Sequence, residues 1–137
     1  MTAIRACLLL VPAIIAANAQ TLSSELEGKR LVSKNSEFAG FEFKNKNTIV
    51  FYAEETGNTP IAEARVRWLS DDTFLAVEKG PETTRCSPKT WIYRAIKRSK
   101  ETIIFHQFWT GWAPSEDPIP TFRIVAPVKL EGATAAP

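Results

Sequence analysis

Aromatic and polar side chains alternate in two segments of the chain, and this combination is typical of a site for a small molecule. Trp91 and Tyr93 are two residues apart, as are Gln107 and Trp109. Residues at this spacing point to the same face of a β-strand, so each pair would place an aromatic ring beside a hydrogen-bonding group. Glu78 would add a carboxylate near the end of another strand. The predicted ligand-binding residues are Glu78, Trp91, Tyr93, Gln107, Trp109 and Trp112.

Catalytic chemistry has much less support in the sequence. His106 is the only histidine, and no Cys, Asp or Glu beside it has the spacing of a metal site. No Ser or Cys stands in a recognisable nucleophile motif. We therefore assign no catalytic residue, metal ligand or cofactor. An alternative is a small enzyme in which Glu78, buried among aromatic rings beside Tyr93, acts as an acid or base.

Short runs of β-branched and aromatic residues, broken by turn residues, predict an all-β protein. Only residues 22–27 suggest a helical turn. Three polar turns, at 45–47, 70–72 and 99–101, are each followed by Thr and an apolar run, which predicts tight hairpins. The connections at 54–60, 80–89 and 110–120 are long. The strands are expected at 28–33, 38–44, 48–53, 61–69, 73–79, 90–98, 102–109 and 121–126.

Alternation of tight and long connections predicts a single antiparallel up-and-down barrel of about eight strands with one closed end and one open end. Symmetric pairing about the turn at 70–72 places Trp68 opposite Phe74 inside the barrel and Arg67 outside. The same pairing about the turn at 99–101 places Trp109 inside, and His106 outside and opposite Arg94. The inner faces of all three hairpins are then apolar or aromatic. The other inner residues predicted from the three hairpins are Phe41, Phe43, Ile49, Phe51, Ala64, Val66, Ala76, Glu78, Trp91, Tyr93, Ala95, Ile103, Phe105 and Gln107.

The pairing also leaves an apolar strip on the outer face, formed by Ile92, Ile96, Ile104 and Phe108. Such patches usually mark contact surfaces. We expect residues 22–27, the C-terminal region or a second copy of the chain to cover this outer strip, so a homodimer is one predicted partner.

The first nineteen residues have the pattern of a secretory signal. Arg5 precedes an apolar run, and Ala17-Asn18-Ala19 is a small-x-small cleavage site. The run is too short to span a bilayer, so no membrane insertion is expected after cleavage. We therefore expect a signal peptide at 1–19, a barrel domain at 20–129, a disordered tail at 130–137, and a secreted or periplasmic location.

The mature chain is nearly neutral, because removal of Arg5 leaves 17 − 1 = 16 basic residues against 15 acidic ones. Nothing in this balance favours nucleic acid or anionic membranes. The basic segment 93–100 is interpreted as a solvated edge, with Arg94 and Arg98 on one side and Lys97 on the other. Cys86 is the one cysteine after cleavage, which excludes an intrachain disulfide and leaves an inert thiol as the simplest interpretation.

The eight short strands, the first strand Gly28-Lys29-Arg30-Leu31-Val32, the Phe-x-Phe of Phe41 and Phe43, and the segment 67–75 resemble the lipocalin-like barrels of exported bacterial proteins. Arg30 stands where the lipocalin Gly-x-Trp motif has Trp. The resemblance spans residues 28–126 and implies a small, mostly apolar ligand held in the barrel without a catalytic residue set.

These observations predict a non-enzymatic exported barrel that binds a small hydrophobic or aromatic molecule at its open end. The main alternative is a protein-interaction module, an inhibitor or envelope adaptor, that uses the long loops or the outer strip. A hollow interior would favour the binding protein, and a filled interior would favour the interaction module. A hydrogen bond between a buried Glu78 and Tyr93 would favour the enzyme.

Overall fold

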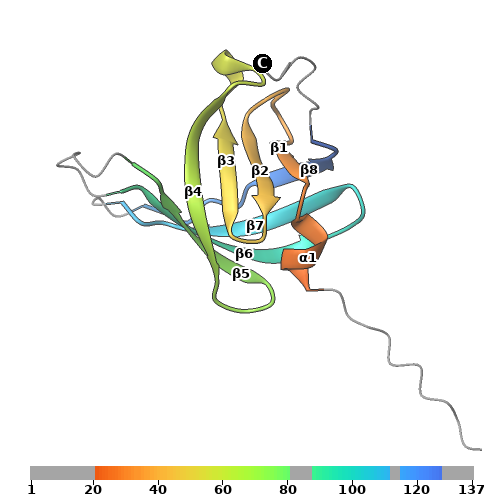
Figure 1. Ribbon diagram of the computed structural model, residues 1–137. Coiled ribbons are helices and arrows are strands. Elements are labelled where there is room, and N and C mark those ends of the chain that lie inside the picture. The colour runs from red at the N-terminus through yellow and green to blue at the C-terminus, as the bar shows by residue number, and fades with distance from the viewer. Residues whose placement is uncertain (1–20, 81–87, 112–114, 128–137) are drawn as a thin grey trace, which may run out of the picture.

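The computed structural model describes residues 21–80, 88–111 and 115–127, and it forms a closed antiparallel barrel (Figure 1). Consecutive strands pair in sequence order, and β8 pairs with β1 to close the barrel. The predicted all-β up-and-down barrel is confirmed. The elements are α1 (Leu22–Leu26), β1 (Arg30–Ser33), β2 (Gly40–Asn45), β3 (Thr48–Tyr52), the 3-10 helix η1 (Glu54–Thr56), β4 (Pro60–Trp68), β5 (Thr73–Glu78), β6 (Thr90–Arg98), β7 (Thr102–Phe108) and β8 (Thr121–Val125).

The interpretations of residues 1–19 and 130–137, Cys86 and Trp112 concern segments outside the described residues. Within the residues that are described, no helix is long and apolar enough to cross a membrane.

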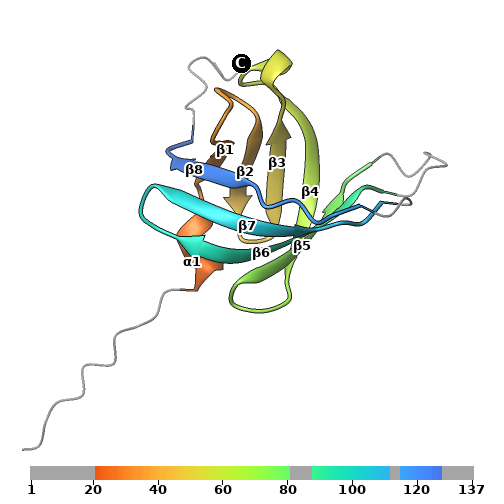
Figure 2. The same ribbon diagram turned by 180° about the vertical axis from the view of Figure 1, so that it is seen from behind.

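The two ends of the barrel differ as the loop lengths predict. Figures 1 and 2 show α1 at the end that carries the tight turn between β4 and β5, and η1 at the far end. Leu22 and Leu26, one helical turn apart, are fully buried in the interior cluster, so α1 plugs the barrel end. The apolar face of α1 thus packs into the barrel and does not cover the outer strip.

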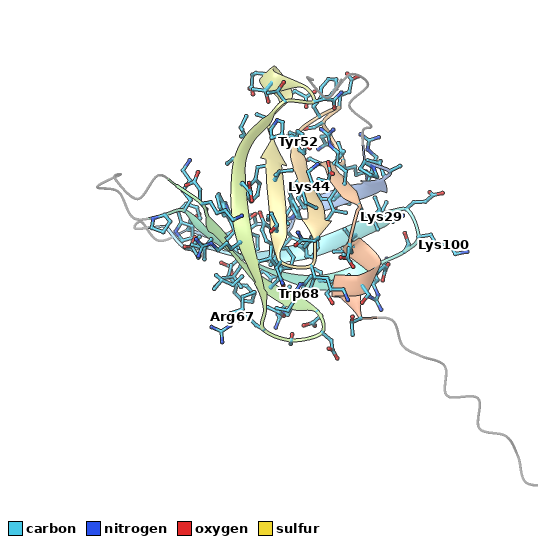
Figure 3. The ribbon with its side chains drawn as sticks, in the orientation of Figure 1. Lys29, Lys44, Tyr52, Arg67, Trp68 and Lys100 are labelled. Carbon is cyan, nitrogen blue, oxygen red and sulfur yellow. The ribbon has the colours of Figure 1, made fainter. Side chains whose placement is uncertain are left out.

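The interior is filled by aromatic rings. The Phe41 side chain is 1% exposed, and six other aromatic rings have centroids within 6.3 Å of its own. The hairpin between β4 and β5 has the predicted register, with Trp68 opposite Phe74 and Val66 opposite Ala76. In Figure 3, Trp68 lies at the end near α1, and Arg67 projects away from the barrel. The rings around Phe41 are Phe43, Phe51, Phe74, Tyr93, Phe105 and Phe122.

A β-bulge in β6 changes the predicted alternation near the third tight turn. The register between β6 and β7 shifts between Ala95 and Lys97, and the extra residue, Ile96, is 51% exposed. Arg94 stays opposite His106 on the outer face, whereas Arg98 is opposite the inward-pointing Ile103. The prediction that Arg94 and Arg98 share one side was therefore wrong.

The bulge has a structural consequence at α1. Arg98 is turned toward the closed end, where its guanidinium lies 2.9 Å from the Glu25 carboxylate. This ion pair joins α1 to β6 in addition to the buried leucines.

Candidate functional site

The predicted site residues on β6 and β7 lie together on the inner wall of the barrel. Tyr93 is directly opposite Gln107, and Trp91 is opposite Ala76 of β5. Trp91 and Tyr93 are successive inward residues of one strand, so both side chains belong to the same inner face. The strand alternation seen in the sequence therefore brings at least these three side chains to one place.

Tyr93 combines a buried aromatic ring with a polar hydroxyl group. Its ring lies 5.2 Å from that of Phe74 and 5.4 Å from that of Phe41, and the residue is 5% exposed. None of the described residues forms a hydrogen bond with its hydroxyl. The hydroxyl oxygen is open to solvent. Among the described residues, Arg30 Nε is the one side-chain atom that is both fully enclosed and without a hydrogen-bond partner, so an unpaired Tyr93 hydroxyl is not fully enclosed. Burial raises the pKa of Tyr93, so at neutral pH the group is a hydroxyl donor.

Trp91 contacts a ring from the other side of the barrel. Its ring centroid is 4.6 Å from that of Phe51 on β3, which is not a neighbour of β6. Both residues pack on the edge of the interior cluster and are partly exposed. Phe51 was predicted to point inward but not to form part of the site. Phe51 and Trp91 together make an apolar aromatic surface inside the barrel, and Trp91 is one inward position along β6 from Tyr93.

The polar side chains near Tyr93 have few internal partners. Gln107 donates its backbone N–H to the Pro118 carbonyl over 2.9 Å, but none of the described residues bonds its side-chain amide. Glu78 is partly exposed and accepts a hydrogen bond from the Lys89 backbone N–H over 3.3 Å. It makes no hydrogen bond to Tyr93 within the described part of the chain. The condition set for the enzyme alternative is therefore not met.

Trp109 does not pack inside the barrel, so that prediction was wrong. β7 ends at Phe108, and Trp109 is 45% exposed. Its backbone N–H donates to Asp117 Oδ1 over 2.7 Å. A Cβ atom on residue 111 would come within 2.1 Å of the Trp109 ring, so the indole packs directly against Gly111. The chain leaves the barrel wall here, and Trp109 lies at the rim.

His106 is on the outer face, as predicted, and it has an acidic partner that the sequence did not reveal. Its Nε2 lies 2.8 Å from Asp117 Oδ2, and its Nδ1 lies 3.4 Å from an Arg94 nitrogen. The Trp109 backbone N–H, and then His106, hold the pKa of Asp117 below its usual range. Asp117 is eleven residues away in a loop, so no local motif links it to His106. No group of three potential metal ligands occurs within the described ranges.

A second polar cluster, also missed from the sequence, lies on the outer face of β1, β2 and β3. Arg30 is 2% exposed and stacks over the Tyr52 ring, with 3.9 Å from its guanidinium carbon to the ring centroid. Tyr52 donates to Glu42 over 2.8 Å, and the other Glu42 oxygen pairs with Lys44 at 2.6 Å. Burial and the Glu42 hydrogen bond raise the pKa of Tyr52 to about 12.

This cluster fixes two loops at the open end. Arg30 donates to the Phe38 carbonyl over 2.9 Å and to Asn58 Oδ1 over 2.7 Å. The Glu54 carboxylate accepts three backbone N–H groups, those of residues 37–39. These bonds, that of Phe38 first, hold the pKa of Glu54 below its usual range. The loops after β1 and β3 therefore form one connected part of the rim.

A surface pocket of about 400 Å³ lies at the opposite end of the barrel, between α1 and the bulge in β6. Two of the four charged residues that line it, Asp72 and Arg98, are engaged within the protein. Asp72 accepts hydrogen bonds from Ser70 and Thr73, and Arg98 pairs with Glu25. The pocket is far from the aromatic and polar groups of the open end, and none of its described lining residues is aromatic.

The fold and site define a small closed eight-stranded antiparallel barrel, consistent with a lipocalin-like barrel, with neutral polar groups among aromatic rings on its inner wall. The chain matches no protein-family model, no curated protein and no solved structure.

Proposed function

We propose that this protein is a non-enzymatic barrel that binds a small hydrophobic or aromatic molecule at its open end. The observation that carries the proposal is the Tyr93 hydroxyl, which sits on a buried ring with no hydrogen-bond partner among the described residues. The hydroxyl oxygen is open to solvent, so it can donate to water or, in place of that water, to a ligand atom. A planar molecule with a carbonyl or similar acceptor would satisfy it while stacking on Trp91 and Phe51.

The packed interior sets the depth at which a ligand binds. Phe41 and the rings around it occupy the middle of the barrel, so a molecule cannot be enclosed there without displacing them. The proposed ligand therefore rests on top of this aromatic core, at the level of Trp91 and Tyr93. It is small, and part of it remains in contact with solvent.

Two matched tyrosine variants test the proposal. Tyr93→Phe removes the hydroxyl that has no partner among the described residues, and Tyr52→Phe removes a hydroxyl on the outer face that donates to Glu42. Monocyclic aromatic ketones and amides, measured by calorimetry, should bind the wild type and the Tyr52→Phe protein alike. Tyr93→Phe should weaken binding by about 1 to 3 kcal/mol, because the ligand's acceptor loses its partner. Equal binding by Tyr93→Phe and the wild type would contradict the proposed site.

The protein-interaction module is the second candidate, and the filled interior favours it. A barrel with a packed aromatic core offers its loops and outer walls more readily than an internal cavity. Tyr93 lies on the inner wall, so Tyr93→Phe should weaken small-molecule binding and leave protein contacts made at the outer wall unchanged.

We also propose that the protein is exported, to the periplasm or the exterior, with cleavage after Ala19. Mass analysis of the protein recovered from that compartment should show an N-terminal Gln20 or its pyroglutamate form. A retained Met1 would contradict this proposal.

A further inference from the structure

The outer wall of β4–β7 carries a row of apolar side chains bordered by arginines. The strand register places Arg67 opposite Leu75, Leu75 opposite Ile92, and Ile92 opposite Phe108. This row crosses four strands, or about 14 Å at the usual strand spacing. Arg65 and Arg94 stand in the rows on either side. We call this surface the arginine-bordered face: Arg65, Arg67, Leu75, Ile92, Arg94 and Phe108.

Few acidic groups of the described residues neutralise the positive charges of the arginines on this face. Arg65 and Arg67 are exposed, and no carboxylate in the described ranges pairs with either. Arg94 has weak contacts only. It lies 3.4 Å from His106 Nδ1 and 5.4 Å from the centre of the Phe108 ring, and it acts on Asp72 only through its charge. The nearby carboxylates are engaged elsewhere, Glu63 by Lys79 and Asp117 by His106.

This concentration of charge is local, because the whole chain is close to neutral. Leu75, Ile92 and Phe108 are only partly exposed, so they form a shallow apolar strip between guanidinium groups. A strip of this kind complements a segment that carries carboxylates on both sides of an apolar side chain.

The geometry points to an extended acidic peptide segment of a partner protein, with one apolar anchor side chain, as the occupant of the arginine-bordered face. A strip about 14 Å long matches a short peptide and is too short to span a standard globular interface. Each strand that the structure describes pairs with a neighbour on both sides, so recognition must come from side chains and not from strand addition.

Two other occupants fit this face less well. In a symmetric dimer the face would meet itself, so surplus positive charge would oppose surplus positive charge. A flat anionic membrane would also have to contact Glu63, Asp72 and Asp117 around the strip.

The test is a selection of random twelve-residue peptides displayed on phage, run in parallel on the wild type and on Arg67→Glu, Arg94→Glu. A matched control, Lys29→Glu, Lys100→Glu, reverses two charges on the side of the barrel away from Arg67 (Figure 3). The wild type and the control should enrich the same peptides, with Asp or Glu flanking an apolar residue. Their synthetic forms should bind the Arg67, Arg94 variant at least about tenfold more weakly.

Three results would overturn the inference. One is enrichment of peptides without acidic residues, or no enrichment at all. Another is equal binding of the selected peptides by the Arg67, Arg94 variant, provided its thermal unfolding matches that of the control. The third is a wild-type dimer in sedimentation, or binding to phosphatidylglycerol vesicles, that the Arg67, Arg94 variant abolishes, since either would assign the face to a different occupant.

Discussion

Phe41 is the centre of the aromatic core, and its truncation tests whether the interior is filled as described. The side chain is 1% exposed and meets rings from strands β2, β3, β5, β6, β7 and β8. Phe41→Ala removes a buried ring that its neighbours cannot replace, because they are fixed on separate strands. The free energy of unfolding should fall by about 4 kcal/mol. For a domain of about 110 residues this lowers the melting temperature by about 15 °C.

The assay is chemical denaturation followed by circular dichroism, with a second variant and a control. Phe41→Leu keeps part of the volume and should cost roughly 1 to 2 kcal/mol, so it remains informative if the alanine protein does not fold. Phe108→Ala makes the same change on the partly exposed outer face and should cost about 1 kcal/mol. Equal losses for Phe41→Ala and Phe108→Ala would refute a filled aromatic interior.

Three further predictions follow from the same structure. Trp68→Ala should cost about 3 kcal/mol in chemical denaturation, since its ring packs on Phe43 and Phe74, whereas Arg67→Ala should cost less than about 0.5 kcal/mol; similar costs would show that inside and outside are exchanged. Both tyrosines have raised pKa values in the folded protein, that of Tyr52 being about 12, so ultraviolet titration should show no phenolate near pH 10. Because folding raises both pKa values, the neutral tyrosines stabilise the folded protein fully below a pH of about 10, and this stabilisation is lost as the pH rises above that value. Ionisation near pH 10 without unfolding would contradict the burial of the tyrosines. The lowered pKa of Glu54 means that its contribution is present above the unfolded pKa of about 4.3 and is lost as the pH falls below it; Glu54→Gln should therefore speed amide exchange at residues 37–39 near neutral pH, and unchanged exchange would contradict the loop contact.

The hairpins were predictable because local turn chemistry fixes their register. Once the turn at 70–72 is recognised, Trp68 must face Phe74, and the alternation of the strands places each later residue inside or outside. The same reasoning placed Tyr93 and Gln107 together on the inner wall. These features depend on residues that are close in the sequence, so one sequence is enough to predict them.

The features that were missed depend on one extra residue or on distant contacts. Nothing in the local sequence shows that Ile96 forms a bulge, and the bulge alone redirects Arg98 to Glu25. Arg30 and Glu42 are charged residues on an outer face, where exposure is the ordinary expectation. They are buried because Tyr52 and the rim loops cover them.

The open-end site is tested most directly by mapping a bound ligand onto the protein by NMR. Isotope-labelled protein would be titrated with monocyclic aromatic ketones and, as a matched set, with the same rings lacking the carbonyl group. The ketones should shift the signals of Trp91, Tyr93 and Gln107 more strongly than the plain rings do, because the carbonyl accepts the Tyr93 hydroxyl. Shifts confined to the outer face, or no difference between the two sets of molecules, would contradict the proposed site.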